Sequence, residues 1–201
     1  DKYDLIAKKL KLKRGMKVLD VGVGWGGLAM HLAKKYGVEV TGITPAKEQV
    51  AYVKQHAKGL KVKAILSTWQ DYNPTTKFDR IVSVGAMEHF GPKNYRALFV
   101  KLNSLIKDDG LFLLHTIGGN FSIDGSDPWV DKYIFPGGVL PSVKQIATAS
   151  EGQFIMEDWH NMGANYDKTL MMWLKNFRGS YLHLDNDKYN ARFKRMWEFY
   201  L

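Results

Sequence analysis

Closely spaced glycines follow a short apolar run near the N-terminus, and residues 18–27 read Val-Leu-Asp-Val-Gly-Val-Gly-Trp-Gly-Gly. Glycine has no side chain beyond hydrogen, so a strand-to-helix turn of this kind lets a nucleotide-like ligand contact bare backbone. The N–H groups of the following helix would face the same ligand. The spacing of Gly22, Gly24 and Gly27 fits dinucleotide sites, whereas that of Gly22, Gly24 and Gly26 fits S-adenosylmethionine (SAM) sites.

Asp20, two residues before the first of these glycines, helps to separate the two cofactor classes. A carboxylate repels a pyrophosphate and attracts the cationic amino group of a methionine moiety. A dinucleotide site also uses an acid about 20 residues further on, where this chain has Ile43 or Thr44. Asp20 therefore favours SAM over a nicotinamide dinucleotide, and a glycine turn that binds no ligand is the remaining alternative.

Polar side chains also follow other predicted strands. Glu88 follows the apolar run 78–84, His115 lies within the run 111–117, and Tyr166 opens a late aromatic segment. The carboxyl ends of parallel strands meet at one edge of a sheet, so Glu88 and His115 can converge there and suit proton abstraction. Each has an ordinary alternative, because Glu88 could cap the next helix while His115 and Tyr166 could be packed core residues.

Trp69 and Gln70 follow the apolar run 62–66. A flat indole beside a nucleotide would stack on adenine, and the alternative is a plain core position.

The pattern along the chain predicts a sheet with covering helices. Strands are predicted at 17–21, 38–43, 62–66, 78–84, 111–117 and near 154–159, and helices at 5–12, 27–36, 45–57, 94–106, 142–149 and about 168–201. Asp108-Asp109-Gly110 is predicted as a turn, and the Gly-, Pro- and Asp-rich segment 118–141 as an insertion that covers the site. Nearly continuous apolar strands that alternate with helices favour an α/β fold with a doubly wound parallel sheet.

Composition bounds the class of protein. The 201 residues fit one domain, with or without an insertion, and the longest apolar run is far shorter than a membrane span of about 20 residues. The absence of cysteine excludes disulfides and thiol catalysis within this chain and fits a cytoplasmic protein. Six scattered histidines lack the spacing of a zinc site, so no metal is predicted.

The net charge of +9 is concentrated in clusters at Lys8-Lys9, Lys11–Lys17 and Lys54–Lys63. These clusters could be an ordinary solvated surface. They could also attract a polyanion, either nucleic acid or an anionic membrane face, and charge does not distinguish the two.

Several longer blocks closely resemble the bacterial cyclopropane-fatty-acyl-phospholipid synthases. The blocks are Phe78–Gly85, Glu88–Tyr95, Leu113–Gly118, Lys132–Gly138, Glu157–Asn161, Tyr166–Met171 and Phe193–Met196. The resemblance covers almost the whole chain, and mycolic acid cyclopropane and methyl-branching synthases are the nearest relatives by pattern.

The resemblance implies a Rossmann-like class I SAM-dependent methyltransferase fold. It implies methyl transfer to a cis double bond of a phospholipid acyl chain, followed by proton loss to a bound bicarbonate and ring closure. The bicarbonate holders would be Glu88, His115, Tyr166 and the backbone near Ile117. The SAM positions would be Asp20, Gly22, Gly24, Gly26, Thr44, Gln49, Trp69 and Gln70.

Other functions remain open at this point. The nearest alternative is a SAM-dependent methyltransferase that does not close a ring and yields a methyl-branched lipid or a methylated small amine. A nicotinamide-dependent oxidoreductase is disfavoured by Asp20, and a binding module without catalysis is disfavoured by Glu88, His115 and Tyr166.

The chain departs from the family pattern in a few places. Val23 stands where relatives often carry cysteine, a change that a backbone contact tolerates. An upstream lipid-binding region, a cysteine-containing segment near the bicarbonate site and a final antiparallel strand are not among these residues. We therefore expect residues 1–201 to be an incomplete catalytic domain with an open acyl channel and an exposed sheet edge.

The resemblance also implies where the protein works. We expect phospholipid acyl chains at an anionic membrane surface as partners, rather than nucleic acid, and a cytoplasmic protein peripheral to the inner face of the membrane. A homo-oligomer is left open.

Overall fold

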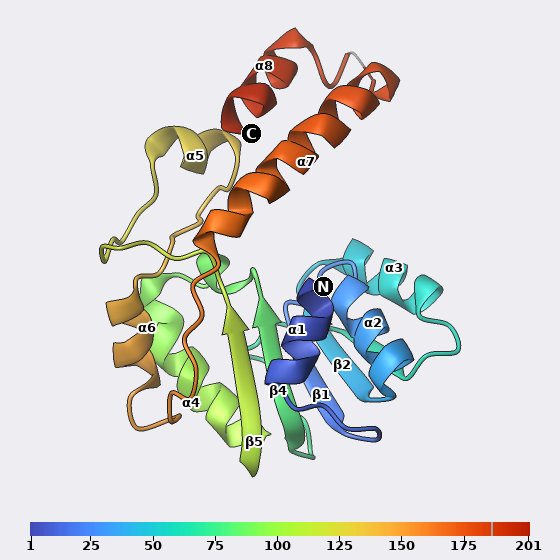
Figure 1. Ribbon diagram of the computed structural model, residues 1–201, viewed down its shortest axis with the longest axis vertical. Helices are drawn as coiled ribbons and strands as arrows, with labels where there is room; N and C mark the ends of the chain where they lie inside the picture. The colour runs from blue at the N-terminus through green and yellow to red at the C-terminus, as the bar shows by residue number, and fades with distance from the viewer. Residues whose placement is uncertain (186) are drawn as a thin grey trace. The chain divides into compact units, whose positions relative to one another are not determined.

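The computed structural model describes residues 1–185 and 187–201 and is shown in Figure 1. The chain forms two compact units, Asp1–Ile155 and Met156–Leu201. The first unit holds the sheet and the glycine turn, and the second unit is helical.

Parallel strands form the centre of the first unit. Within the described residues the sheet has five strands in the order β3-β2-β1-β4-β5, and every pairing between neighbours is parallel. The strands are β1 (Lys17–Val21), β2 (Glu39–Thr44), β3 (Val62–Leu66), β4 (Phe78–Val84) and β5 (Ile106–His115). The helices are α1 (Lys2–Lys9), α2 (Gly27–Tyr36), α3 (Lys47–His56), α4 (Tyr95–Leu105), α5 (Pro128–Tyr133) and α6 (Val143–Ser150). This arrangement confirms the predicted parallel α/β fold.

Alternate residues of the strands enter apolar clusters on the two faces of the sheet. Val18 packs with the buried side chains of α1 and α2, whereas Leu19 packs with those of α4. This period of two is the geometry of a strand that is covered on both faces. The predicted strands 17–21, 62–66 and 78–84 match the structure residue for residue.

Helix α1 is fastened to the sheet and to α2 by polar contacts. The Arg80 guanidinium of β4 donates to the Leu10 carbonyl at 2.6 Å, just beyond the end of α1. In the first turn of α1, Asp4 accepts from Tyr36 at 2.8 Å and from Lys35 at 2.9 Å, and it contacts His31 Nε2 at 2.9 Å. These contacts fix both ends of a helix of eight residues, which would be marginal in isolation.

Two predictions about secondary structure are wrong: a strand near residues 154–159 and a turn at residues 108–110. Residues 154–159 form no strand, and Ile155 is 92% exposed. This apolar stretch therefore does not pair with a strand of the sheet. The predicted turn Asp108-Asp109-Gly110 lies inside β5, where pairing with β4 passes directly from Ile106 to Leu111. The intervening residues therefore bulge out of the ladder, which satisfies their turn preference without ending the strand.

The predicted insertion 118–141 contains a short helix and is closed at its base. Asp127 caps α5 by accepting from the backbone of Trp129 and Val130. The Gly119 N–H donates to the Pro141 carbonyl at 2.9 Å, so the two ends of the segment lie together. The next helix, α6, begins at Ser142 with the reciprocal capping bonds to Gln145.

The second unit is built from α7 (Tyr166–Ser180) and α8 (Ala191–Tyr200). Phe177 of α7 contacts the rings of Phe193 and Trp197 on α8, and Arg178 pairs with Glu198 at 3.0 Å. Asn190 caps α8. Aromatic packing between the two helices therefore holds this unit together.

The anchoring of α1 through Asp4 is testable by its pH dependence. Hydrogen bonds from Lys35, His31 and Tyr36 hold the pKa of Asp4 well below its usual range. The stabilisation is therefore present above pH 3.8 and is lost as the pH falls further, because protonation removes it in the folded state. We expect Asp4→Asn to lower the melting temperature at pH 7 by roughly 2–5 °C.

Thermal denaturation followed by circular dichroism measures this effect. Asp124→Asn, at an exposed acid of the 118–141 segment, is the control and should leave the melting temperature unchanged. A deficit in Asp4→Asn that stays the same far below pH 3.8 would contradict the assignment.

Candidate functional site

The glycine turn connects β1 to α2 and leaves one side open. Gly22 and Gly24 have φ values of 90° and 54°, in the left-handed region that other residues rarely adopt. A Cβ on Gly22 would lie 2.7 Å from the Ala86 side chain, whereas a Cβ on Gly24 would meet no atom within 4 Å. The turn therefore packs against the protein at Gly22 and presents bare backbone at Gly24, as a bound cofactor requires.

Backbone bonds tie this turn to the end of β2. The Gly22 and Val23 N–H groups both donate to the Ile43 carbonyl, at 3.0 and 3.1 Å. Val23 lies directly over Gly42, where any added Cβ would meet it at 2.4 Å. Val23 thus fills a gap between the turn and β2.

Asp20 is a buried acid at the base of the turn. The residue is 2% exposed, and burial raises the pKa of its carboxyl from 3.8 to about 7. A buried carboxylate is costly unless a cation compensates for it. Asp20 therefore suits a cationic ligand group, and its contact with the cofactor stays a prediction.

Thr44 and Gln49 lie together where β2 passes into α3. The Thr44 hydroxyl donates to Gln49 Oε1 at 2.6 Å. The Ser67 N–H donates to the Thr44 carbonyl at 3.0 Å and brings the segment after β3 to the same edge. The predicted SAM residues from separate strands thus converge at the carboxyl edge of the sheet.

The residues after β3 differ in exposure. Trp69 is 8% exposed and packs in the core cluster with Leu19 and Ile43, whereas Gln70 is exposed. The indole is therefore largely a core side chain, and its stacking on adenine stays a prediction.

Glu88 lies in a short 3₁₀ turn, Met87–His89, just after β4. The residue is 6% exposed, and its Oε1 accepts the Ile117 N–H at 2.7 Å. The other oxygen, Oε2, is buried without a hydrogen-bond partner among the described residues. Ile117 thus orients the carboxyl group and leaves one oxygen for a ligand, a more specific role than the general backbone contact predicted at this residue.

His115 ends β5 beside the same turn. It pairs with Val84 across the sheet, and its carbonyl accepts the Gly85 N–H at 2.9 Å. Its Nδ1 is likewise buried without a hydrogen-bond partner in the part of the chain that the structure describes. Burial, and to a smaller extent the charge of Lys2, lowers the pKa of the imidazole, while Glu88 opposes this shift. The ring is therefore neutral at neutral pH.

The base of the 118–141 segment reaches Glu88. The Val139 N–H donates to the Glu88 carbonyl at 2.8 Å, and the Tyr95 hydroxyl donates to the Val139 carbonyl at 3.3 Å. Burial and the Glu88 charge raise the pKa of Tyr95. The base of the 118–141 segment is thus bonded to Glu88 through Val139.

Lys2 is a charged group that the sequence analysis missed. Burial lowers the pKa of its ammonium group, and the charge of Glu88 acts in the opposite direction. The leading helix was predicted over residues 5–12, whereas α1 begins at Lys2.

Tyr166 opens α7 in the second unit. Its ring contacts Trp173 edge to face at 6.1 Å. Burial, together with the charge of Tyr166 and a hydrogen bond to it, raises the pKa of Tyr200 to about 12. The place of Tyr166 beside Glu88 and His115 stays a prediction.

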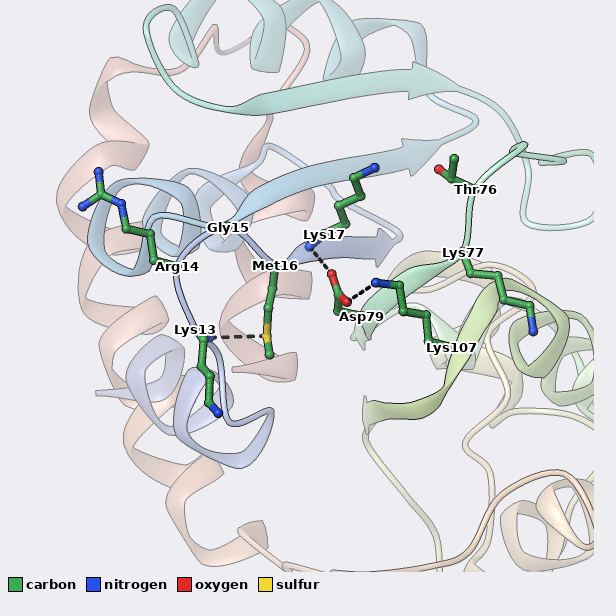
Figure 2. A pocket seen from close by; sticks show the side chains of 9 residues that line it. All are labelled: Lys13, Arg14, Gly15, Met16, Lys17, Thr76, Lys77, Asp79 and Lys107. Carbon is green, nitrogen blue, oxygen red and sulfur yellow. Dashed lines mark hydrogen bonds and ion pairs between the residues drawn. The ribbon is translucent and has the colours of Figure 1, made fainter.

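A shallow depression of about 740 Å³ lies at the opposite, amino edge of the sheet (Figure 2). We call it the basal depression, and it is lined by Lys13, Arg14, Gly15, Met16, Lys17, Thr76, Lys77, Asp79 and Lys107. Asp79 accepts the Lys17 N–H at 2.7 Å and pairs with the Lys107 ammonium at 2.6 Å. The other charged side chains that line the depression are cationic, so the depression suits an anion. It is separate from the cofactor turn, which lies at the carboxyl edge.

Solved structures with the same architecture define the class. The chain matches mycolic acid cyclopropane synthase CmaA1 complexed with SAH and CTAB with a TM-score of 0.84 and 32% identity, over 98% of this chain and 76% of that one. It matches the cyclopropane synthase MmaA2 from Mycobacterium tuberculosis with a TM-score of 0.85 and 28% identity, over 97% and 75%. The parallel sheet, the open glycine turn and the buried acid before it are those of a class I SAM-dependent methyltransferase.

The chain belongs to the mycolic acid cyclopropane synthetase family, whose model matches residues 1–201. It is 50% identical over 200 residues to the cyclopropane-fatty-acyl-phospholipid synthase of Escherichia coli (strain K12). It is 34% identical over 215 residues to cyclopropane mycolic acid synthase 1 of Mycobacterium tuberculosis (strain ATCC 25618 / H37Rv). The first match covers 100% of this chain and 52% of that relative, and the second covers 96% and 74%. The chain thus spans about half the length of the Escherichia coli relative.

The burial of Asp20 predicts pH-dependent cofactor binding. A cationic ligand prefers the ionised carboxylate, so affinity should rise as the pH passes upward through about 7. We expect S-adenosylhomocysteine (SAH), whose amino group stays protonated over this range, to bind more tightly at pH 8 than at pH 6. Asp20→Asn should weaken binding at pH 8 by about tenfold or more and remove the pH dependence. Isothermal titration calorimetry measures both.

The same substitution should stabilise the protein without its ligand. The raised pKa means that stability present below pH 3.8 is lost as the pH rises through about 7. The difference is on the order of 4 kcal/mol. An Asp20→Asn variant that melts at or below the wild-type temperature at pH 8, or that binds SAH as tightly, would contradict this role.

Proposed function

We propose that this protein transfers a methyl group from SAM to a cis double bond in an unsaturated phospholipid acyl chain and closes a cyclopropane ring. One observation carries the proposal beyond family membership. Glu88 Oε2 and His115 Nδ1 are buried without partners among the described residues, at the sheet edge that holds the SAM turn. Polar atoms in that state point to a small polar group that occupies the space near them.

The proposed reaction needs a base only after the methyl group has been transferred. The sulfonium of SAM supplies the methyl group, and the alkene π electrons form the new carbon–carbon bond while SAH leaves. The resulting cation must lose a proton from the transferred carbon before that carbon closes the ring. An alkene has no acidic group to deprotonate beforehand, so the protein has to hold a base beside an apolar chain and exclude water.

The residues around Glu88 fit a bound bicarbonate. When bound there, bicarbonate would supply the base that accepts this proton. Glu88 Oε2 and His115 Nδ1 can each share a hydrogen with a small oxyanion, and the Ile117 N–H fixes the direction of the carboxyl group. Tyr166 is proposed as a third holder.

The SAM site is proposed from the converging strand ends. The open backbone at Gly24 and the uncapped start of α2, as seen in the described residues, offer N–H groups. Asp20 offers a carboxylate for the amino group, and Thr44 and Gln49 lie at the next strand end. These groups bind and orient the cofactor, so that its methyl group faces the Glu88 side of the same edge.

Product analysis tests the proposed reaction. The protein is mixed with SAM, bicarbonate and vesicles of unsaturated phosphatidylglycerol and phosphatidylethanolamine, and the acyl chains are analysed by mass spectrometry. We expect a product heavier by one CH₂ group that resists hydrogenation. Glu88→Gln should lower its rate of formation by roughly 10²–10⁴-fold, because the base is no longer held.

Glu151→Gln, at an exposed acid after α6, is the matched control and should retain the wild-type rate. Methyl-branched lipid, or a methylated amine with unchanged lipid, would replace ring closure by the simpler methyltransferase reaction. Full turnover in Glu88→Gln would contradict the role of the carboxyl group.

We also propose that the protein works peripherally at an anionic, inner membrane face. The supporting observations are the net charge of +9 and the basic clusters. No helix in residues 1–185 and 187–201 is long and apolar enough to cross a bilayer. The basal depression lies at the edge opposite Glu88. Its charges therefore support long-range attraction to the membrane rather than the seating of an acyl chain.

Charge-reversal substitutions distinguish long-range attraction to the membrane from the seating of an acyl chain. We expect Lys13→Glu with Arg14→Glu to weaken binding to anionic vesicles by about tenfold or more at low salt. Lys93→Glu with Lys144→Glu, at exposed sites outside the depression, should weaken it to a similar extent. Vesicle co-sedimentation measures both, and both effects should vanish at about 1 M salt. Binding that ignores vesicle charge and salt would contradict this part of the proposal.

A further inference from the structure

Helix α7 has one face that packs within the second unit and an opposite face that is exposed. On the packing face, Tyr166 contacts Trp173, and Phe177 contacts the rings of α8. These three residues are seven and four positions apart, so they share one side of the helix. Arg178 is held at the same interface by its ion pair with Glu198. This side of α7 is therefore occupied by the unit's own aromatic packing.

The opposite side of α7 carries two methionines between two lysines. Lys168, Met171, Met172 and Lys175 follow the spacing i, i+3, i+4, i+7, which gathers them on one face of a helix. With about 3.6 residues per turn, the middle of that face lies roughly 170° around the helix from Phe177. All four residues are exposed, Met171 by 56% and Met172 by 55%. We call this surface the lysine–methionine face.

The lysine–methionine face continues past the end of α7. The Tyr181 N–H still donates to the Phe177 carbonyl, so the helical path runs directly into the 3₁₀ turn Tyr181–His183. Leu182 in that turn lies two heptads after Lys168 and is 85% exposed. Exposed apolar side chains that gather on one surface mark a site of contact with a partner.

The charges on this face favour an anionic lipid surface as the partner. Lysine ammonium groups can reach phosphates on their long stems, while unbranched methionines enter the boundary between headgroups and acyl chains. Asp167, the acid of α7, lies roughly a quarter turn from the middle of the face. A protein partner would have to place an apolar groove and acids at matching points, whereas an anionic membrane offers apolar depth and negative charge everywhere.

We propose that the lysine–methionine face of α7, together with Leu182, is the surface that inserts into the headgroup layer of an anionic membrane. The inference rests on the proposed function, because it supplies the direct lipid contact that a phospholipid-modifying protein needs. It assigns the apolar part of membrane binding to the second unit, whereas the basic clusters of the first unit act at long range. The two contributions differ in their salt dependence, since salt screens charges but does not remove the gain from apolar burial.

A polarity-sensitive label tests the contact directly. The chain contains no cysteine, so Met172→Cys can carry a single fluorophore. With vesicles of phosphatidylglycerol and phosphatidylethanolamine, we expect its emission to shift to the blue and to be quenched by lipids with a quencher near the headgroup. Arg195→Cys is the control, because Arg195 lies on the side of α8 opposite Phe193 and Trp197, which face α7. Its label should keep the emission of a group in water.

Serine substitutions measure the apolar contribution to affinity. Met171→Ser with Met172→Ser should weaken vesicle binding by about tenfold or more, because both side chains lose apolar area to bury. The loss should persist at about 1 M salt. Met156→Ser, at a methionine that is 52% exposed but lies outside α7, is the matched control and should bind as wild type does. Vesicle co-sedimentation measures the affinities, and equal melting temperatures show that the variants are folded.

The outcomes separate this inference from the proposed reaction. A labelled Met172→Cys protein that binds vesicles with unchanged emission would overturn the contact and leave the reaction standing. A blue shift that grows with protein concentration in the absence of vesicles would assign the face to a second copy of the chain and overturn the lipid contact. The expected shift with vesicles, but with no modified lipid from wild type, would support the contact and overturn the reaction. Wild-type protein that does not sediment with vesicles would overturn the proposed membrane partner and this inference with it.

Discussion

Two carboxyl groups, Asp20 and Glu88, are buried at the edge where the parallel strands end. Burial alone raises the pKa of Asp20 to about 7, and one oxygen of Glu88 has no partner among the described residues. Buried groups of this kind cost stability unless a ligand compensates for them. The glycine turn follows Asp20 and the Ile117 N–H holds Glu88, so this edge is suited to ligands that bring charge and hydrogen bonds.

The parallel sheet makes this organisation precise because each strand end is bonded to its neighbour. The Ser83 hydroxyl of β4 donates to the Val21 carbonyl of β1 at 2.9 Å, and the Gly85 N–H donates to the His115 carbonyl of β5. The Ile117 N–H then holds Glu88. Residues far apart in the chain therefore occupy fixed positions along one edge, and a substitution at any of these bonds would move the acid relative to the cofactor turn.

The sequence predicted what depends on local pattern and missed what depends on tertiary partners. Strands such as 78–84 were predicted residue for residue because their apolar residues cluster between polar or glycine boundaries. Residues 154–159 look similar locally, but strand formation needs a neighbour, and Ile155 is exposed. Glu88, which follows one apolar run, and His115, which lies within another, could be singled out as candidates from those places alone.

The two edges of the sheet differ in charge. This difference bears on the order in which the protein would approach a membrane and take up an acyl chain. The carboxyl edge buries the acids Asp20 and Glu88, whereas the basal depression at the amino edge concentrates cations around Asp79, the single acid of its lining. A charge distribution of this kind orients a protein in the field of an anionic surface before contact, with the basic edge leading. The acidic edge would then face away from the bilayer at first.

Seating of an acyl chain near Glu88 would therefore require the protein to turn after its first approach, or another part of the protein to contact the lipid. The exposed apolar side chains Met171, Met172 and Trp173 of α7 are the kind of surface that a lipid contact uses. In the proposed function, attraction to the membrane and uptake of the acyl chain would therefore be separate steps.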